Sequence, residues 1–112
     1  LINAKLNNID NVNFICQDAE KYIQELSASG VIKKLGAIIL DPPRAGLSKK
    51  TRLTVRDSQV RNVIYVSCNP KNLSQDLKAL TETYDIEKMI PVDMFPHTRH
   101  AEVIAILKSN KV

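Results

Sequence analysis

The 112-residue sequence predicts an α/β domain with a mostly parallel sheet and an antiparallel pair of strands at one edge. Two patterns support this fold class. Short apolar runs alternate with longer stretches in which apolar residues recur every three or four positions. The last two apolar runs are joined by a short link, which favours antiparallel neighbours. With 44% hydrophobic and 25% charged residues, the chain can bury one core, and its length suits a single domain.

The first half of the chain contains two predicted strands with a helix between them. Val12–Cys16 is a short apolar run that predicts a strand. Ala37–Leu40 is apolar on both faces, which is typical of a buried parallel strand, and the prolines at 42 and 43 end it. Asp18 is a good N-cap for the intervening helix, whose apolar stripe consists of Ala19, Tyr22, Ile23 and Leu26.

The second half continues the alternation. A weaker helix is predicted from Ser48 to about Gln59, and a second buried strand over Val63–Ser67. Asn69 and Pro70 are preferred at the start of a helix, and the leucines at 73, 77 and 80 give that helix one apolar side. The antiparallel pair is predicted over Tyr84–Phe95 and Glu102–Lys108.

Composition limits the classes of protein that the chain can represent. The formal net charge is +4, and six basic residues but only one acidic residue lie between Arg44 and Arg61. Such a basic stretch is typical of a phosphate-binding surface, although a solvated helix face explains the charge equally well. No apolar run approaches the ~20 residues that cross a bilayer, so no membrane span is predicted. Cys16 and Cys68 form no disulfide or zinc pattern, which favours a reducing, cytoplasmic location.

Cys68 is the first candidate for chemistry. It follows a predicted strand and precedes a predicted helix, so its sulfur lies near the positive end of a helix dipole. That position favours the thiolate, which is the nucleophilic form of cysteine. A small apolar residue at a strand end is the alternative interpretation. Cys16 lies inside an apolar run and is interpreted as a core thiol without chemistry.

Carboxylates supply the other candidates. Asp41 follows a predicted central strand and is held by two prolines, so it can accept hydrogen bonds from an amine or a base edge, although it can also be an ordinary turn residue. Glu102 begins an otherwise apolar strand and can act as a general base if it faces a site; an exposed strand end is the more frequent case. Ligands bind beyond the carboxyl ends of parallel strands, and Asp18, Asp41 and Cys68 are all predicted there.

Two other interpretations are weak. His97 and His100 are spaced like metal ligands, but no cysteine or carboxylate is placed to complete a site. A thiol hydrolase built on Cys68 and His97 lacks both an oxyanion hole and a group that orients the histidine.

Three blocks of the sequence, at residues 41–47 (DPPRAGL), 65–70 (YVSCNP) and 94–102 (MFPHTRHAE), resemble one family in the same order. It is the RNA (uracil-5-)-methyltransferase family of the RumA and TrmA type. The Phe-Pro-His-Thr sequence resembles its 23S rRNA branch more than its tRNA branch, although a tRNA uridine C5-methyltransferase is the related alternative. The resemblance implies a Rossmann-like class I methyltransferase fold, S-adenosyl-L-methionine as cofactor and RNA as partner.

The resemblance also implies roles for individual residues. Cys68 would be the nucleophile that adds to C6 of a flipped-out uridine, and Glu102 would remove the C5 proton. Asp41 would be a cofactor-binding residue, and Asp18 would lie near the adenine of the cofactor. The basic stretch would contact the RNA backbone. A noncatalytic nucleic-acid-binding domain is the alternative from another class, but it would require neither Cys68 nor Glu102.

The chain departs from the family in what it lacks. The family's catalytic domain begins with a strand, a Gly-rich loop and an acidic second strand, whereas residues 1–112 start in what resembles the helix after that second strand. We therefore expect the C-terminal part of the methyltransferase domain, inactive alone. The sheet order of the family, 3-2-1-4-5-7-6, then becomes five strands ordered 3-4-5-7-6, with an exposed edge that favours self-association.

Overall fold

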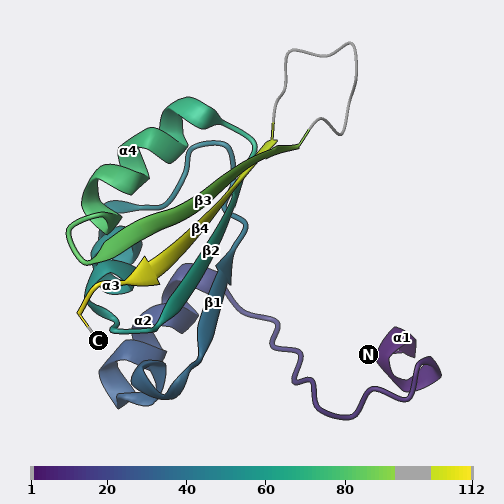
Figure 1. The fold of residues 1–112 in the computed structure, drawn as a ribbon. Coiled ribbons are helices and arrows are strands. Elements are labelled where there is room, and N and C mark those ends of the chain that lie inside the picture. The colour runs from purple at the N-terminus through teal and green to yellow at the C-terminus, as the bar shows by residue number, and fades with distance from the viewer. Residues whose placement is uncertain (1, 93–101, 112) are drawn as a thin grey trace.

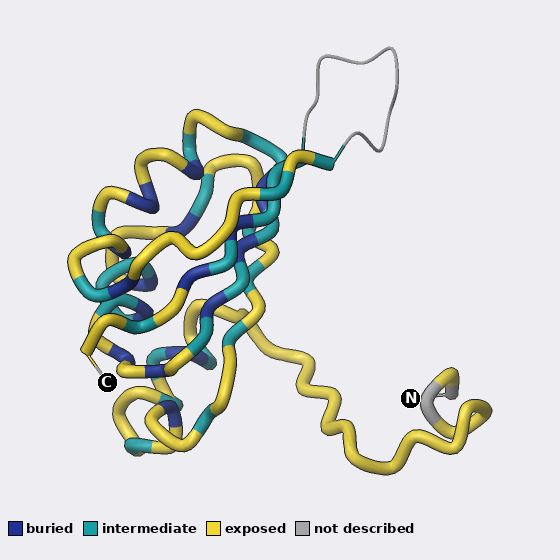
Figure 2. The backbone as a smooth tube through the Cα atoms, viewed as in Figure 1, coloured by how far each residue is buried: buried dark blue, intermediate teal, exposed yellow. Residues whose placement is uncertain are grey.

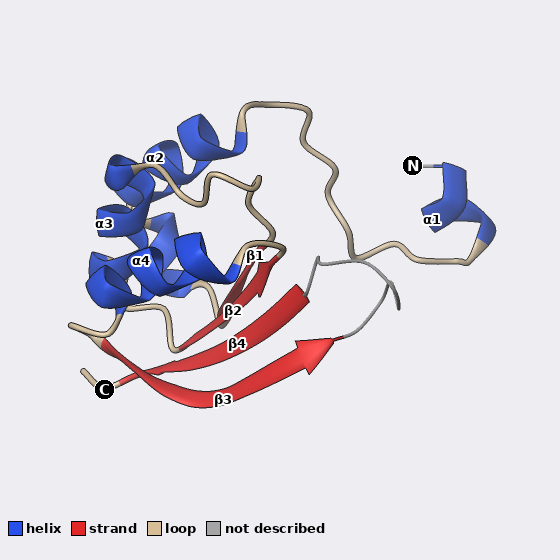
Figure 3. Cartoon of the chain, turned by 90° about the horizontal axis from the view of Figure 1, so that it is seen from above, coloured by secondary structure: helices blue, strands red, loops and turns tan. Residues whose placement is uncertain are grey.

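The computed structural model describes residues 2–92 and 102–111. It has two layers, a twisted sheet and a layer of helices against one of its faces (Figures 1 and 3). The predicted alternation of strands and helices is confirmed from residue 19 onward. The elements are α1 (Ile2–Leu6), α2 (Ala19–Ser29), the 3-10 helix η1 (Val31–Lys34), β1 (Ala37–Leu40), α3 (Lys49–Asp57), β2 (Asn62–Ser67), α4 (Pro70–Leu80), β3 (Tyr84–Val92) and β4 (Glu102–Ser109).

The sheet has four strands in the order β1-β2-β4-β3. β1 and β2 are parallel, whereas β4 runs antiparallel to both β2 and β3. The antiparallel pair at one edge is therefore confirmed. The described sheet, however, has one parallel and two antiparallel pairings, so it is mixed rather than mostly parallel, because no further parallel strand pairs with β1. The order of these four strands also matches the last four positions of the expected sheet.

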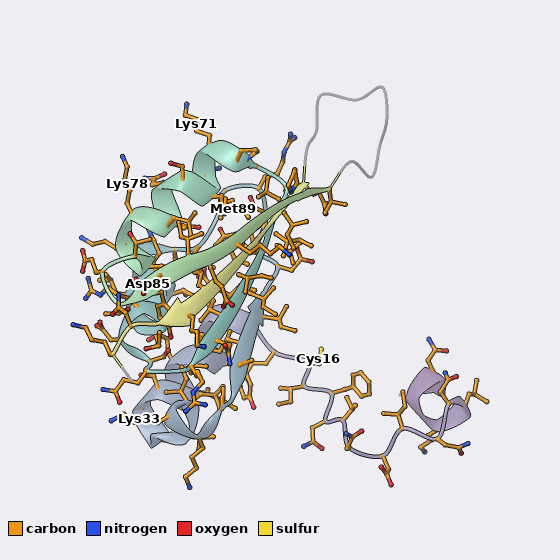
Figure 4. The ribbon with its side chains drawn as sticks, viewed as in Figure 1. Cys16, Lys33, Lys71, Lys78, Asp85 and Met89 are labelled. Carbon is orange, nitrogen blue, oxygen red and sulfur yellow. The ribbon has the colours of Figure 1, made fainter. Side chains whose placement is uncertain are left out.

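The segment Val12–Cys16 is not a strand, which corrects the expected five-stranded sheet. It runs as extended chain away from the sheet (Figures 1 and 2), and Phe14 on it is 55% exposed. Cys16 is exposed rather than buried in a core (Figure 4). The segment pairs with none of the four strands of the described sheet. Without a neighbour, a strand can satisfy neither its backbone groups nor its apolar face.

Short polar residues begin the helices where the sequence predicted. Asp18, Ser48 and Asn69 occupy the N-caps of α2, α3 and α4, and the side chain of each accepts a hydrogen bond from a backbone N–H of the first turn. Each such cap contributes about 0.5–2 kcal/mol. Gly30, with φ of +80°, ends α2 in a left-handed conformation that glycine adopts without strain.

The hydrophobic core lies between the sheet and helices α2, α3 and α4. On β2 and β4 alternate residues are fully buried against the helices, and Leu73 and Leu80 of α4 meet them. All three helices lie on the same face of the sheet (Figure 3), and no helix in the described part of the chain covers the other face. Ile39, on the edge strand β1, is consequently 69% exposed.

Candidate functional site

Three predicted site residues lie at one end of the sheet, which we call the carboxyl edge: the end where β1 and β2 finish and β4 begins. Asp41 directly follows β1, Cys68 directly follows β2, and Glu102 is the first residue of β4. The last pair in the register of β2 with β4 is Ser67 with Val103. Cys68 and Glu102 are therefore the next positions along two neighbouring strands.

A tight turn fixes the backbone around Cys68. The Ser67 hydroxyl donates to the carbonyl of Asn69 at 2.9 Å and accepts from the Asn69 N–H at 3.0 Å. The Asn69 side chain in turn accepts from the Lys71 N–H at 3.1 Å and begins α4. Cys68 is a half-buried free thiol between the end of β2 and the positive end of the α4 dipole. This is the placement that the sequence predicted.

Asp41 lines a hollow beside the start of α2. The hollow measures about 200 Å³ and lies between the start of α2 and the end of β1, with Asp41, the two prolines after it and Glu20 among its lining residues. Asp18 caps α2 immediately before the lining residues Ala19 and Glu20. In the described part of the chain no strand precedes Asp18, so its predicted place after a strand is wrong, and Asp18 is not among the residues that line the hollow.

Sequence reasoning missed a buried carboxylate. Asp76 on α4 is 3% exposed, and it accepts hydrogen bonds from the Tyr65 hydroxyl and from the Leu47 N–H, the latter at 2.9 Å. Burial and the neighbouring Asp76 raise the pKa of Tyr65 above its ordinary value. The pattern that could have revealed Asp76 is its position on the leucine side of α4, between Leu73 and Leu80, where an acidic residue interrupts an apolar stripe.

The basic stretch extends over several parts of the fold. It begins with Arg44 near the carboxyl edge, follows α3 and ends with Arg61 before β2, at the opposite end of the strand. Within it, Arg52 faces Asp76 at 3.4 Å, and Arg56 is ion-paired at 2.9 Å and 3.0 Å with two acidic neighbours. Lys49 and Lys50 are exposed at the start of α3.

The predicted link between the last two strands, with His97 and His100, lies outside the described residues. Within the described ranges, none of the helices has the length and apolar character that a bilayer crossing requires.

A mixed α/β sheet with polar groups beyond the ends of its parallel strands defines a Rossmann-like domain. The comparison with known proteins then places it: the chain belongs to the tRNA (uracil-5-)-methyltransferase family, whose model matches residues 1–110.

Two curated relatives agree with this assignment. An uncharacterized RNA methyltransferase of Lactobacillus johnsonii is 40% identical over 111 residues, which cover 97% of this chain and 24% of the relative. One of Bacillus cereus is 44% identical over 107 residues, which cover 95% and 23%. This chain thus spans about a quarter of the length of these relatives.

A solved structure supports both the family and the fold. It is that of the Pyrococcus abyssi tRNA (uracil-54, C5)-methyltransferase in complex with S-adenosyl-L-homocysteine. The match has a TM-score of 0.70 at 30% identity and covers 95% of this chain and 24% of that one. The Rossmann-like methyltransferase fold expected from the sequence is therefore confirmed.

Proposed function

We propose that this chain is the C-terminal part of a catalytic domain that transfers a methyl group from S-adenosyl-L-methionine to C5 of a uridine in RNA. Family membership supports the reaction class. The observation that carries the proposal is the placement of Cys68 and Glu102 on neighbouring strands, each one step beyond Ser67 and Val103, the last register pair of β2 and β4. A thiol and a carboxylate at one edge are the two groups that this chemistry requires.

In the proposed reaction, the Cys68 thiolate adds to C6 of the uridine, and the electron pair of the C5–C6 double bond makes C5 nucleophilic. S-adenosyl-L-methionine, when bound, supplies the methyl group that C5 takes up. Glu102 then removes the proton from C5, the double bond forms again, and the thiolate of Cys68 leaves C6. The uridine must first leave its base stack, at a cost of a few kcal/mol, before C6 can meet the sulfur.

The hollow beside Asp41 fits part of the cofactor. Its apolar wall, which includes the prolines at 42 and 43, suits a flat adenine ring, and the Asp41 and Glu20 carboxylates suit ribose hydroxyls or a positive charge. Asp18 would stand at the adenine side. At about 200 Å³, the hollow is smaller than the roughly 300–1,000 Å³ typical of sites that enclose a ligand. Residues beyond this chain would therefore have to hold the remainder.

Two classes of RNA are candidate substrates. The Phe-Pro-His-Thr sequence at 95–98 favours 23S rRNA, whereas the relative of known structure is named for its action on tRNA. We propose a ribosomal substrate on the sequence resemblance, and methylation assays with unmodified 23S rRNA and with unmodified tRNA distinguish the two.

The reaction itself is tested with RNA that contains 5-fluorouridine. Fluorine replaces the C5 hydrogen, so there is no C5 proton to remove and the bond between sulfur and C6 persists. A protein of the relatives' full length that carries this chain should form an adduct with this RNA that survives denaturing electrophoresis. Cys68→Ala should abolish the adduct and methylation while RNA affinity stays within about twofold, since one sulfur contributes little to a phosphate-dominated interface. Cys16→Ser is the matched control and should react normally.

RNA binding without any adduct would instead identify a noncatalytic nucleic-acid-binding domain and overturn the proposal.

We further propose that the 112-residue chain self-associates through the free edge of β1.

A further inference from the structure

The buried carboxylate of Asp76 is not used by the proposed reaction. A carboxylate that is 3% exposed is stable only when its oxygens are bound. Oδ2 accepts from the Leu47 N–H and from the Tyr65 hydroxyl, and Oδ1 faces Nε of Arg52 at 3.4 Å. Its partners come from the loop after β1, from β2 and from α3, so this one side chain joins three elements to α4.

A second side chain of α4 contacts the same loop. Asn72, one turn before Asp76, donates its side-chain N–H to the carbonyl of Arg44. The two α4 residues thus hold residues 44 and 47, the two ends of the segment that follows Asp41 and its prolines. Since α4 begins at Pro70, directly after the Cys68 turn, the helix connects that loop to the candidate nucleophile.

Gly46 shows how closely the loop approaches the helix. Its φ is +82°, and a Cβ built on it would lie 2.8 Å from Oδ2 of Asp76 and 3.4 Å from Cβ of Asn72. A side chain at this position would therefore collide with the carboxylate. The contact is closely fitted, and it depends on both the glycine and the buried acid.

We propose that Asp76 and Asn72 are positioning residues that fix the Asp41 loop relative to Cys68. The proposal rests on the proposed function, in which Asp41 binds the cofactor and Cys68 attacks the uridine. The methyl donor and the nucleophile are then held by two different loops, and a displacement of about 1 Å between reacting groups can lower a rate by up to ~100-fold. Neither residue touches the reacting atoms; both act through the loop.

The test uses Asn72→Ala and Asp76→Asn in a protein of the relatives' full length that carries this chain. Each should lower kcat for RNA methylation by about tenfold while KM for RNA changes by less than about twofold. The reason is that each change displaces the Asp41 loop relative to Cys68 but leaves the surface that binds RNA as it is. Lys78→Ala is the matched control: Lys78 is exposed on the same helix and points away from the sheet (Figure 4), so kcat should not change.

A rescue experiment separates positioning from general stability. The amide introduced by Asp76→Asn can keep both hydrogen bonds on its oxygen, but it turns an N–H toward Arg52. Adding Arg52→Gln offers that N–H a carbonyl acceptor, so the double variant should recover most of the lost kcat. If thermal stability, KM and kcat decline together and the double variant recovers nothing, the role is merely structural and the proposal is wrong.

Amide hydrogen exchange at Gly46 and Leu47 in the 112-residue chain provides a readout that needs neither RNA nor cofactor. In Asn72→Ala, exchange at these two amides should accelerate at least about tenfold while core amides of β2 stay protected. Unchanged exchange would show that the α4 side chains do not hold the Asp41 loop, and it would overturn the proposal. A wild-type protein that does not methylate uridine would overturn the proposed function. The role of Asp76 and Asn72 in catalysis would then also be wrong, even where the exchange result is as expected.

Discussion

Glu102 is half-buried at the first position of β4, one step beyond the last register pair that links this strand to β2. The proposed role for its carboxylate is to accept a single proton after the methyl group has been transferred. Glu102→Gln keeps the size of the side chain but removes its basicity. We therefore expect methylated RNA to remain bonded to Cys68 and to accumulate as a covalent complex on a denaturing gel.

Glu87→Gln, at an exposed position of β3, is the matched control and should release product normally. The double variant Cys68→Ala/Glu102→Gln should form no complex. Free methylated RNA at the wild-type rate from Glu102→Gln would show that another group removes the proton.

Gly46 has both a left-handed backbone and a close neighbour at the position of an added Cβ. Gly46→Ala combines a left-handed φ with a contact of 2.8 Å to Asp76, and each forces a shift. We expect the free energy of unfolding of the 112-residue chain to fall by about 1–3 kcal/mol, measured by urea denaturation. Gly36→Ala is the control, because nothing lies within 4 Å of its added Cβ. Equal effects of the two changes would contradict the role given to the Asp76 contact.

At the scale of elements, the Tyr65 hydroxyl on β2 donates to Asp76 on α4 and so links the strand to the helix. Burial and Asp76 raise the pKa of Tyr65 above its ordinary value of 10.0. Below pH 10 the tyrosine is neutral in both states, so its contribution to stability is fully present. Above pH 10 the unfolded chain ionises first, and this contribution is lost as the pH rises toward the folded-state pKa.

Tyr65→Phe should therefore lower the free energy of unfolding at pH 8 by about 1–3 kcal/mol, because Asp76 loses a buried donor. It should also flatten the decline of stability between about pH 10 and pH 11. Urea denaturation across this range measures both effects. Burial raises the pKa of Tyr84 as well, so Tyr84→Phe should remove a further part of the slope. An identical slope in the wild type and in Tyr65→Phe would contradict this account.

The elements that could be predicted from the sequence are those whose signals are local. The caps at Asp18, Ser48 and Asn69 and the apolar runs of β1 and β2 specify the start or the burial of an element within a few residues. Val12–Cys16 has an equally apolar pattern, but a strand requires a partner, and pairing is a property of the whole sheet rather than of the segment.

In the candidate site, too, residues with local signals could be predicted and those that depend on distant contacts could not. Cys68, Asp41 and Glu102 were identified because each stands beside a strand end in a distinctive motif, and that position alone brings them to the carboxyl edge. Asp76 was missed because its hydrogen bonds are made with Leu47 and Tyr65, which are distant in sequence. The sequence pattern that indicates such contacts is a carboxylate within the apolar stripe of a helix.

At the scale of the whole molecule, the chain provides one wall of the proposed cofactor site. A hollow of about 200 Å³ leaves much of S-adenosyl-L-methionine in contact with water. Isothermal titration calorimetry of the 112-residue chain should therefore show very weak binding or none. Micromolar affinity would contradict this expectation and would mean that Asp18, Asp41 and their neighbours suffice. Asp41→Asn would then establish whether the affinity arises in this hollow.

The sheet presents two features that soluble domains usually cover, an edge strand with free backbone groups and a face without helices. At β1 both occur together, and Ile39 on this strand is 69% exposed. An edge of this kind pairs readily with another strand, and a charge on it prevents such pairing. Sedimentation velocity of the 112-residue chain should show dimers or larger species that Ile39→Lys converts to monomer.

The same charge placed at Ile86 on β3, the opposite edge of the sheet, should leave the association unchanged although Ile86 is 44% exposed. The comparison isolates the edge from general hydrophobicity, because both variants remove one exposed isoleucine and add one positive charge. A wild-type chain that stays monomeric at high concentration would show that the twist and shortness of β1 already protect it. Dissociation by Ile86→Lys instead would move the interface to the other side of the sheet, beside β3.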